Sequence, residues 1–444
     1  MKKYILFPLL AAFAFNINAQ DFDTNPTVKI DNKDEQIQFT IGARMMADVA
    51  YYHSDYTPMK SGAAITDARI RTSMTYKNWY FYADFGFAGG KFSQKNLFLQ
   101  YSQENNGANH AIKAGYYNDP ASMARNTSLG SYHFIARPSS SMALAEGRQL
   151  GITYKFNNKH FFANQGVFAE NKYNEQIAGF QGATVSGRWL YIPINEKHET
   201  FQVGVSARYQ HLGTGEVTNN VLKKTLTLSS PLETYVDENG DFLRAEMPWA
   251  NNVYNVNVEA LYRTKKLFAR GEFMYRHVTK SRDDQALFEA NLGSIDSWGS
   301  LQSWQSGNPL GSNSFIGGYV EAGYLLFGKP YSYNSSDALL GGMNGKSLEV
   351  VARYSYTGLN DIVAGEYYSY GRDQYYPNGM IGDWPATSKS IGGGNMHSAT
   401  LGVNYSFNKF VQVMVGYTYH NLNRDKYTHD KTFHTLQGRL MFTF

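Results

Sequence analysis

Ten basic residues carry the clearest chemical signal in the sequence. Eight of them fall on the polar side of segments in which polar and apolar residues alternate: Arg44, Arg69, Arg71, Lys113, Arg208, Arg263, Arg353 and Arg439. The other two, Arg125 and Arg137, lie in a long connection between such segments. Rows of guanidinium and ammonium groups can replace part of the hydration shell of an anion. These residues therefore predict a polar face with a weak preference for anions.

Acidic residues share these polar faces, so the basic excess is modest. They are Asp48, Asp67, Asp84, Glu104, Glu259 and Glu349, and two further lysines, Lys77 and Lys155, also fall there. Arg125 and Arg137 are balanced within their connection by Asp119 and Glu146. An alternative is that the charges only keep a polar interior hydrated and pair across strands. The position of a charge at the narrowest part of the interior would matter more than the net charge, because a narrow passage with low-dielectric walls focuses the electric field.

Motifs for other chemistry are incomplete. Residues 341–347 approach a phosphate-binding loop, but Leu340 stands where the motif needs glycine, and an alternating stretch follows instead of a helix. Residues 237–241 lack the ordered acidic spacing of a helix-loop-helix calcium site. The 11 histidines show no metal-binding spacing, and no Gly-x-Ser-x-Gly elbow occurs. We predict no catalytic, cofactor or metal site; a Ser, His and Asp triad assembled only in the fold is the enzymatic alternative.

Composition narrows the class of protein. The chain has 444 residues, a formal net charge of +4 and no cysteine, which excludes disulfides, thiolate metal sites and a lipid-modified N-terminal cysteine. Hydrophobic residues make up 43% and the mean hydropathy is −0.44, too polar for a bundle of membrane-spanning helices. The near-neutral charge gives no case for a nucleic-acid partner. With 41 glycines and 15% aromatic residues, the chain fits one large all-β body.

The N-terminus has the pattern of an export signal. Lys2 and Lys3 precede an apolar stretch at residues 4–15, and Ala19 is a small residue suited to cleavage. An uncleaved anchor is the alternative, but the stretch is shorter than the roughly 18 residues that span a bilayer. We predict a signal peptide at 1–19, a periplasmic lead-in at 20–36 and one barrel domain at 37–444.

Alternation with a period of two recurs along the mature chain. Residues 37–51, for example, place apolar side chains at odd positions and mostly polar ones at even positions. The pattern predicts about 16 strands, at 37–51, 65–77, 79–87, 96–104, 109–118, 147–157, 160–170, 181–194, 200–212, 252–266, 267–279, 314–328, 347–358, 396–408, 409–421 and 432–444. An even number of long strands is typical of outer-membrane β-barrels. An array of soluble β-sandwiches, the alternative, would need linkers that the sequence lacks.

The connections alternate between short and long. Short turns rich in Asn and Lys fall at 77–78, 105–109, 157–159, 195–199, 265–266 and 408–409. Longer polar connections fall at 52–64, 88–95, 119–146, 171–180, 213–251, 280–313, 359–395 and 422–431. This predicts short turns at the periplasmic rim and long loops outside the cell. The joint at 329–346 is long although it should be periplasmic.

Several stretches resemble a known family of outer-membrane porins, porin O and P or phosphate-selective porins. The motifs that carry the resemblance are Gly-Lys-Pro-Tyr at 328–331, Leu-Glu-Val-Val-Ala-Arg-Tyr-Ser at 348–355, Leu-Asn-Asp at 359–361, Thr-Leu-Gly-Val-Asn-Tyr at 400–405 and the ending at 436–444, with weaker agreement at 68–71 and 147–151. The long joint at 329–346 belongs to the most characteristic block. The specific motifs cover about the last quarter of the chain, and the strand pattern covers most of it.

The resemblance implies a trimeric porin of 16 strands whose third external loop, 119–146, folds inward and narrows the channel. Phosphate-specific members carry dense basic residues at the narrowest point and in the fifth loop. Here the fifth loop, 213–251, holds Glu216, Glu233, Asp237, Glu238, Asp241 and Glu246 against Lys223, Lys224 and Arg244. An acidic mouth would repel dianions, so the resemblance carries over no phosphate ligand.

The expected function is passive diffusion of small hydrophilic solutes and ions, with outer-membrane lipid, small anions and two further copies of the chain as partners. The alternative is a barrel that binds a glycan or a partner through the loops 280–313 and 359–395. Their aromatic residues would stack on sugars or pack within the loops: Trp298, Trp304, Tyr367, Tyr368, Tyr375, Tyr376 and Trp384. An energy-coupled transporter would need 22 strands and a plug domain.

Overall fold

The computed structural model describes most of the chain after the N-terminus. It covers residues 28–32, 36–173, 179–213, 217–218, 221–222, 225–289, 299–307, 310–362, 368–370, 373–375, 381–382, 390–424, 427 and 429–444. The predicted signal peptide and the start of the lead-in lie outside this part. So do the seven loop aromatics of the adhesion alternative, as whole residues or as side chains: Trp298, Trp304, Tyr367, Tyr368, Tyr375, Tyr376 and Trp384.

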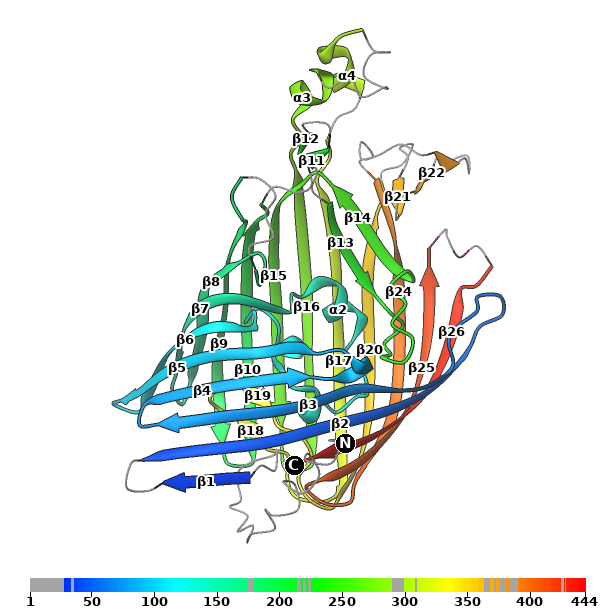
Figure 1. The fold of residues 1–444 in the computed structure, drawn as a ribbon. Coiled ribbons are helices and arrows are strands. Elements are labelled where there is room, and N and C mark those ends of the chain that lie inside the picture. The colour runs from blue at the N-terminus through cyan, green and yellow to red at the C-terminus, as the bar shows by residue number, and fades with distance from the viewer. Residues whose placement is uncertain are drawn as a thin grey trace, which may run out of the picture.

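Sixteen antiparallel strands close into a barrel (Figure 1), which confirms the fold prediction. They are β2 (Ile37–His53), β3 (Gly62–Tyr76), β4 (Trp79–Gly86), β5 (Ser93–Asn105), β6 (Ala108–Asn118), β7 (Arg148–Asn157), β8 (Phe161–Ala169), β9 (Ala183–Glu196), β10 (Glu199–His211), β15 (Ala250–Arg263), β16 (Leu267–Lys280), β17 (Asn313–Phe327), β20 (Ser347–Asp361), β24 (Ser390–Ser406), β25 (Val411–Asn423) and β26 (Thr432–Thr443). Each pairs with its neighbours in the chain, and β2 pairs with β26 to close the ring. The final residue completes the seam, because Phe444 and Ala43 exchange two backbone hydrogen bonds of 2.7 and 2.9 Å.

The strands alternate between an apolar outer face and a polar inner face. On β2, Met45 and Val49 are exposed on the outside, whereas Arg44 and Asp48 are buried on the inside. Lipid offers the backbone no hydrogen-bond partner, so only a closed sheet leaves no strand edge unpaired. Aromatic side chains such as Tyr51 stand exposed at strand ends, where membrane interfaces favour amphipathic rings.

Short turns join the strands at the end that holds the C-terminus. The link between β5 and β6 is the pair Asn106-Gly107, with φ of 50° and 76°. Positive φ at both central residues is what a tight turn matching the strand twist requires, and Asn-Gly adopts it at low cost. The opposite end carries the long loops, as predicted. It also bears small elements: η1 (Ala88–Gly90), β11 (Val217–Thr218), β12 (Val221–Leu222), α3 (Asp284–Glu289), α4 (Leu301–Gly307), β21 (Tyr368–Tyr370), β22 (Asp373–Tyr375) and β23 (Ile381–Gly382).

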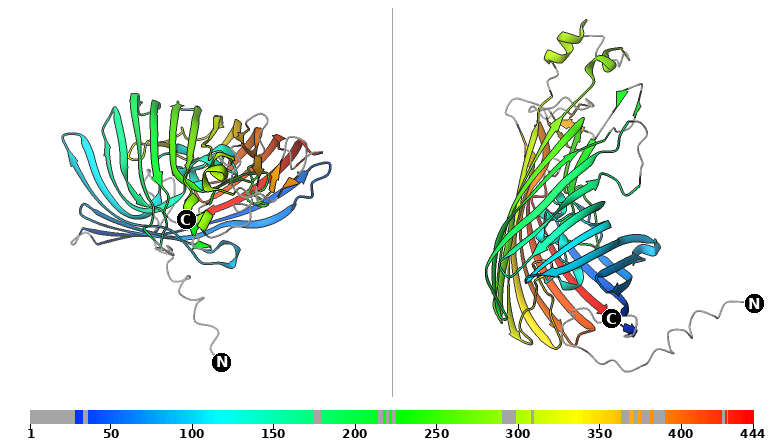
Figure 2. Two further views of the ribbon diagram at one scale, coloured as in Figure 1. Left: turned by 90° about the horizontal axis from the view of Figure 1, so that it is seen from above. Right: turned by 90° about the vertical axis from the view of Figure 1, so that its left-hand side faces the viewer.

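Three connections fold into the barrel interior. The third loop, 119–147, carries α1 (Met123–Asn126), η2 (Leu129–Ser131) and α2 (Ser139–Leu144), so the predicted inward loop is confirmed. The fifth loop adds the hairpin β13 (Thr225–Ser230) with β14 (Leu243–Pro248), and the long joint after β17 adds β18 (Tyr333–Asn334) with β19 (Leu339–Leu340). Figure 2 shows, from above, the strand ring surrounding these segments.

Two further features complete the fold, a short N-terminal strand and a cluster of buried apolar side chains. A short strand, β1 (Val28–Asn32), pairs with the start of β2. No helix in the described residues is long and apolar enough to cross a membrane. The largest cluster of buried apolar side chains is made chiefly by the inward segments and the wall behind them, including Leu144, Leu243 and Phe268. The interior on that side is therefore packed, and open space is left beside β2 to β8.

Candidate functional site

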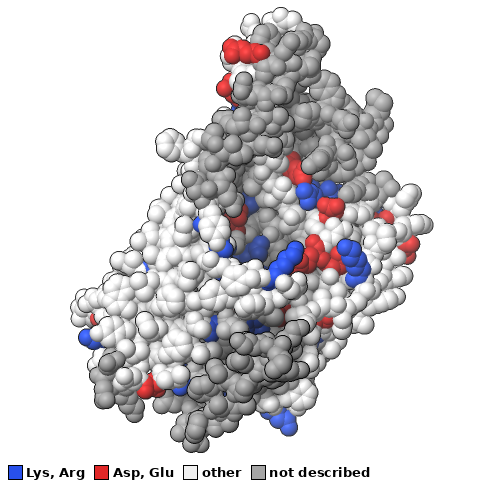
Figure 3. Space-filling model, viewed as in Figure 1, with Lys and Arg blue, Asp and Glu red and all other residues white. Residues whose placement is uncertain are grey.

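The inward third loop and the wall opposite it enclose a cavity rich in arginine, here called the arginine cavity. Its volume is ≈ 230 Å³. Six arginines line it, from β2, β3, the third loop and the start of β7: Arg44, Arg69, Arg71, Arg125, Arg137 and Arg148. Figure 3 shows basic side chains in the hollow at the centre of the molecule. Five of the ten predicted basic residues are thus brought to one place.

Two carboxylates pair directly with these arginines among the described residues. Asp67 accepts from Arg44 and from Arg69, both at 2.6 Å, and Asp84 lies 3.0 Å from Arg69. Arg71 Nε and Nη2 are buried without a hydrogen-bond partner among the described residues. Arginines outnumber the carboxylates around this cavity, so this part of the interior is positive, and the low-dielectric walls strengthen the field. Arg71 therefore lines the cavity without a carboxylate partner among the described residues.

Arg125 and Arg137 also hold the third loop in shape. Arg125, on α1, donates to the carbonyl oxygens of Ser141 and Met142 in α2, at 2.9 and 2.7 Å. Arg137, just before α2, donates to the carbonyls of Ala124 and Thr127 around the end of α1, at 2.8 and 2.7 Å. Each arginine therefore satisfies carbonyls that a short helix leaves unpaired. Burial and the neighbouring Arg137 lower the pKa of Arg125 to about 10, so it stays charged at neutral pH.

The third loop is anchored to the wall that it covers. Glu272 on β16 accepts from the backbone N–H groups of Met123 and Ala124 at the start of α1, at 2.7 and 2.9 Å. Farther along, Tyr132 donates to Glu321 on β17 at 2.8 Å. Arg353 on β20 donates to the carbonyl oxygen of Ala136, also at 2.8 Å. The loop is tied to one side of the barrel, so the channel is displaced toward β2 to β8.

Glu146 fixes the return of the third loop. Its carboxylate lies 2.9 Å from Arg276 and 3.9 Å from Arg208. Burial alone would raise the pKa of Glu146, but the two arginines outweigh it and hold the pKa at about 2. The group is therefore ionised across the physiological range.

In the described part of the fifth loop, which the sequence predicted to form an acidic mouth, three carboxylates are partnered and Glu238 is exposed. Glu233 is buried and lies 2.6 Å from Arg353, and it accepts from Ser139 N at 3.0 Å. Burial opposes ionisation, but Arg353 lowers the pKa of Glu233 overall. Asp237 is buried and accepts from Lys60 N, while Glu246 pairs with Arg244. Arginines neutralise Glu233 and Glu246, and backbone N–H groups hold Asp237, because the loop turns inward. Glu216, Lys223 and Lys224 fall outside the described residues.

Four of the predicted basic residues do not line the arginine cavity or the second, larger cavity described next. Arg439 pairs with Asp48 at 2.7 and 2.6 Å, and Arg208 with Asp119 at 3.2 Å. Arg353 serves Glu233, as above. Arg263 donates to the carbonyl oxygen of Tyr331 at 2.9 Å, near the short turns. All four are buried. The polar face of a strand therefore holds two kinds of arginine, those that line a cavity and those that hold an inward segment, and the alternation alone does not tell them apart.

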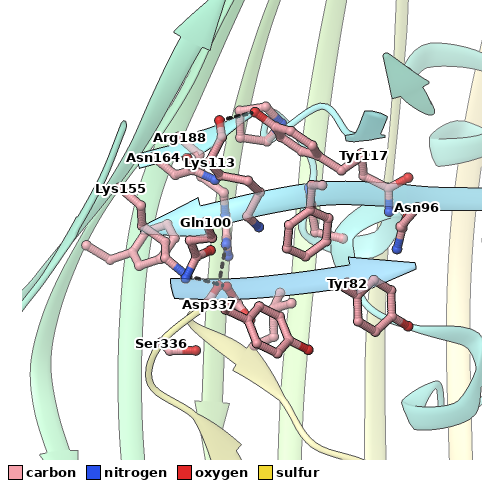
Figure 4. Close-up of a pocket in the computed structure, with 17 residues that line it drawn as sticks. Tyr82, Asn96, Gln100, Lys113, Tyr117, Lys155, Asn164, Arg188, Ser336 and Asp337 are labelled. Carbon is pink, nitrogen blue, oxygen red and sulfur yellow. Dashed lines mark hydrogen bonds and ion pairs between the residues drawn. The ribbon is translucent and has the colours of Figure 1, made fainter. Parts of the chain in front are cut away.

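A larger cavity of ≈ 400 Å³, here called the ring cavity, continues toward the short turns (Figure 4). Lys113 lines it, with its ammonium 4.6 Å from the centre of the Phe98 ring. Lys155 lies across from it and pairs with Asp337, from the long joint, at 2.8 Å. Although burial opposes ionisation, Lys155 and Lys113 lower the pKa of Asp337. This cavity shares four lining residues with the arginine cavity: Tyr82, Asn96, Asn118 and Asn126.

A third cavity, the rim cavity, extends the space to the beginning of β2 and the end of β3. It measures ≈ 290 Å³ and includes Gln38 and Thr75, and it shares Arg71, Tyr80 and Tyr82 with the cavities above. The shared lining residues show that the three polar cavities adjoin one another along β2 to β8.

Sequence reasoning missed Arg148 and the anchoring acids. Arg148 is the first residue of β7, on the side of the alternation that faces outward farther along the strand, yet it lines the arginine cavity. At a strand end the side chain is free of the regular pleat, so period-two alternation assigns it wrongly. Glu272 and Glu321 do follow the alternation and were available as a signal on β16 and β17.

The incomplete motifs behave as turns. Residues 341–346 connect β19 to β20, and Asp237 accepts from Asn239 N in a local turn. Within the described residues no group of three or more His, Asp or Glu side chains is placed to hold a metal ion.

A closed barrel of sixteen strands, apolar outside and polar inside, with long loops at one end and a loop narrowing the interior, is the architecture of a bacterial outer-membrane porin. Residues 39–444 match the family described as phosphate-selective porin O and P, and the chain belongs to that family. It is accordingly a protein of the outer membrane.

Solved structures agree in fold at low identity. The anion-selective porin from Comamonas acidovorans superposes with a TM-score of 0.51 at 11% identity, over 92% of this chain and all (100%) of that one. The outer membrane channel DcaP of Acinetobacter baumannii gives 0.50 at 10% identity, over 94% and 99%. Among curated proteins, no sequence matches this chain.

Proposed function

We propose that this porin is a passive channel, not an enzyme, in which small anions are weakly preferred over cations. The observation that carries the proposal is the arginine cavity, where six arginines face two carboxylates at the inward loop. The arginine, ring and rim cavities adjoin one another through shared lining residues, which supports a polar route past that point. The name of the Comamonas acidovorans porin, which describes it as anion-selective, is consistent with the proposal.

The test is the reversal potential of the mature protein in a planar bilayer under a chloride salt gradient. We expect the sign of an anion-preferring channel. Arg71→Gln should move the potential toward zero, because it removes a cavity cation that is not committed to a carboxylate. Lys159→Gln is the matched control, since Lys159 also loses one positive charge but is 61% exposed in a short turn. A potential of zero in the native protein, or equal shifts in both variants, would overturn the proposal.

Phosphate is a separate arm of the same experiment. Because Glu233 and Asp237 are buried and partnered, the fifth loop presents less free negative charge than its composition suggests. We infer that inorganic phosphate enters the arginine cavity and competes with chloride. Partial block of the chloride current by added phosphate supports this, and an unchanged current contradicts it.

We further propose that the protein matures by removal of residues 1–19 and assembles as a homotrimer, as the family resemblance implies. Intact-mass measurement of the purified protein should give a chain beginning at Gln20. Sedimentation in detergent should give three chains per particle, and a monomer would refute the trimer.

A further inference from the structure

The ring cavity carries more chemistry than a passage for inorganic ions needs. Its lining combines five aromatic rings with five side-chain amides. The rings are those of Tyr80, Tyr82, Phe98, Tyr117 and Phe162, and the amides those of Asn96, Gln100, Asn118, Asn126 and Asn164. In Figure 4 the labelled side chains from neighbouring strands converge on one space. The volume of ≈ 400 Å³ falls within the range of about 300–1,000 Å³ found for small-molecule sites.

The rings form a ladder across β4, β5 and β6. Tyr80 and Tyr82 have ring centres 6.2 Å apart, Tyr82 and Phe98 5.4 Å, and Phe98 and Tyr117 5.8 Å. The first two pairs are stacked and the last is edge-on. A hydrated anion gains little from the face of an aromatic ring, whereas the apolar face of a ring-shaped solute packs well on it. The ladder therefore points to an organic solute with a ring.

The amides indicate that the ring is polyhydroxylated. Asn118 donates to the carbonyl oxygen of Arg125 at 2.9 Å, and Asn126 donates to those of Asp119 and Ser122, both at 2.8 Å, so both amides are held in place by the third loop. The side-chain oxygen of Asn164 is buried without a hydrogen-bond partner among the residues described. An apolar ring would cover these amides and leave their remaining polar atoms unpaired, which is unfavourable. Hydroxyl groups around a sugar ring can both donate to and accept from them.

The adjoining arginine cavity supplies the anion site for such a solute. Tyr82 and Asn96 line both cavities, so a ligand lying on Tyr82 is next to the arginines. Arg148 already donates to Asn96, and Arg71 has donors to spare. We propose that the two cavities together bind a phosphorylated hexose, with the sugar on the ring ladder and the phosphate among the arginines. This inference rests on the proposed function and names its substrate class.

The test compares three solutes in the native channel: glucose 6-phosphate, glucose and inorganic phosphate. Block of the chloride current is titrated with each in a planar bilayer. We expect glucose 6-phosphate to bind about tenfold more tightly than either of the others, because it alone engages both cavities. Equal affinity for glucose 6-phosphate and phosphate would overturn the proposal. The comparison is a ratio between solutes, so it fails independently of the reversal potential that tests the proposed function.

Variants then assign the effect to the rings. Phe98→Leu keeps an apolar side chain but removes a ring from the centre of the ladder, and glucose 6-phosphate should then bind little better than phosphate. Tyr82→Leu is the second variant, in case the first does not fold. Phe81→Leu is the matched control, since Phe81 lies beside Tyr82 on β4 but is 37% exposed on the outer face. Equal loss in Phe98→Leu and Phe81→Leu would contradict a site on the rings.

Discussion

At the scale of the residue, the charged side chains inside this barrel have two roles: some line a cavity, and others form ion pairs or hydrogen bonds that hold the fold. Arg71 lines the arginine cavity and has two donor atoms without a hydrogen-bond partner among the described residues, whereas Arg439 forms a bidentate pair with Asp48 and is buried. Arg125 and Arg137 do both, because they satisfy helix carbonyls and also line the arginine cavity. A count of lumen charges therefore overstates the charge that a solute meets. Selectivity should follow the unpaired donors.

The Asp48–Arg439 pair should contribute to stability. Asp48→Asn leaves a buried guanidinium without its anion, and breaking a buried pair in this way costs about 3–5 kcal/mol. We expect a clearly lower midpoint for urea unfolding in lipid vesicles, followed by tryptophan fluorescence. Glu196→Gln, which removes the acid of the exposed Lys159–Glu196 pair, should change the free energy of unfolding by less than about 1 kcal/mol. Similar effects of both substitutions would show that water screens the interior pair.

At the scale of the element, the third loop is a folded insert held by the wall. Glu272 accepts from the backbone at the start of α1, and Glu321 accepts from Tyr132 in the middle of the third loop. At the end of the loop, Glu146 pairs with Arg276 on the wall. Helices this short are not stable alone. Their carboxylate and arginine partners on β16 and β17 supply the missing stabilisation, and thereby set the width of the channel.

The pH dependence of that insert follows from Glu146. Its pKa of about 2 lies below the ordinary value of 4.5, so its contribution to stability is present above about pH 4.5 and is lost as the pH falls toward 2. Removing the carboxylate with Glu146→Gln should flatten the fall in unfolding midpoint between pH 5 and pH 2. Unfolding midpoints measured across this range in both proteins check it. A fall of the same size in both would mean that Glu146 does not hold the loop.

At the scale of the whole molecule, the closed ring of strands and the band of apolar side chains on its outer face, here called the apolar belt, make the barrel a membrane protein. The belt is the outward half of the same alternation that places charges inside. Because the inward segments cover the β9 to β24 side, the channel runs off-centre along β2 to β8. The wall on the covered side is therefore structural, and the opposite wall meets the solute.

The belt can be tested on one strand. Val320, in the middle of β17, is 62% exposed, and Leu326 near its end is 48% exposed on the same face. Val320→Lys should make folding into lipid vesicles less favourable by about 2–4 kcal/mol. Leu326→Lys should make it less favourable by only about 0–1 kcal/mol, because Leu326 lies close to the membrane interface. Equal costs at the two depths would contradict the placement of β17 in the bilayer.

By itself the sequence determined the sixteen strands, their inner and outer faces and the alternation of turns with loops, because the two-residue period is local and lipid enforces it on every strand. The inward third loop was expected from the family resemblance and not from this period. Only the tertiary structure decided which inner charges meet a solute. That outcome depends on contacts between distant segments, such as Glu233 with Arg353 and Asp337 with Lys155. Such contacts form when a loop returns to a wall far away in sequence, which no period in the chain records.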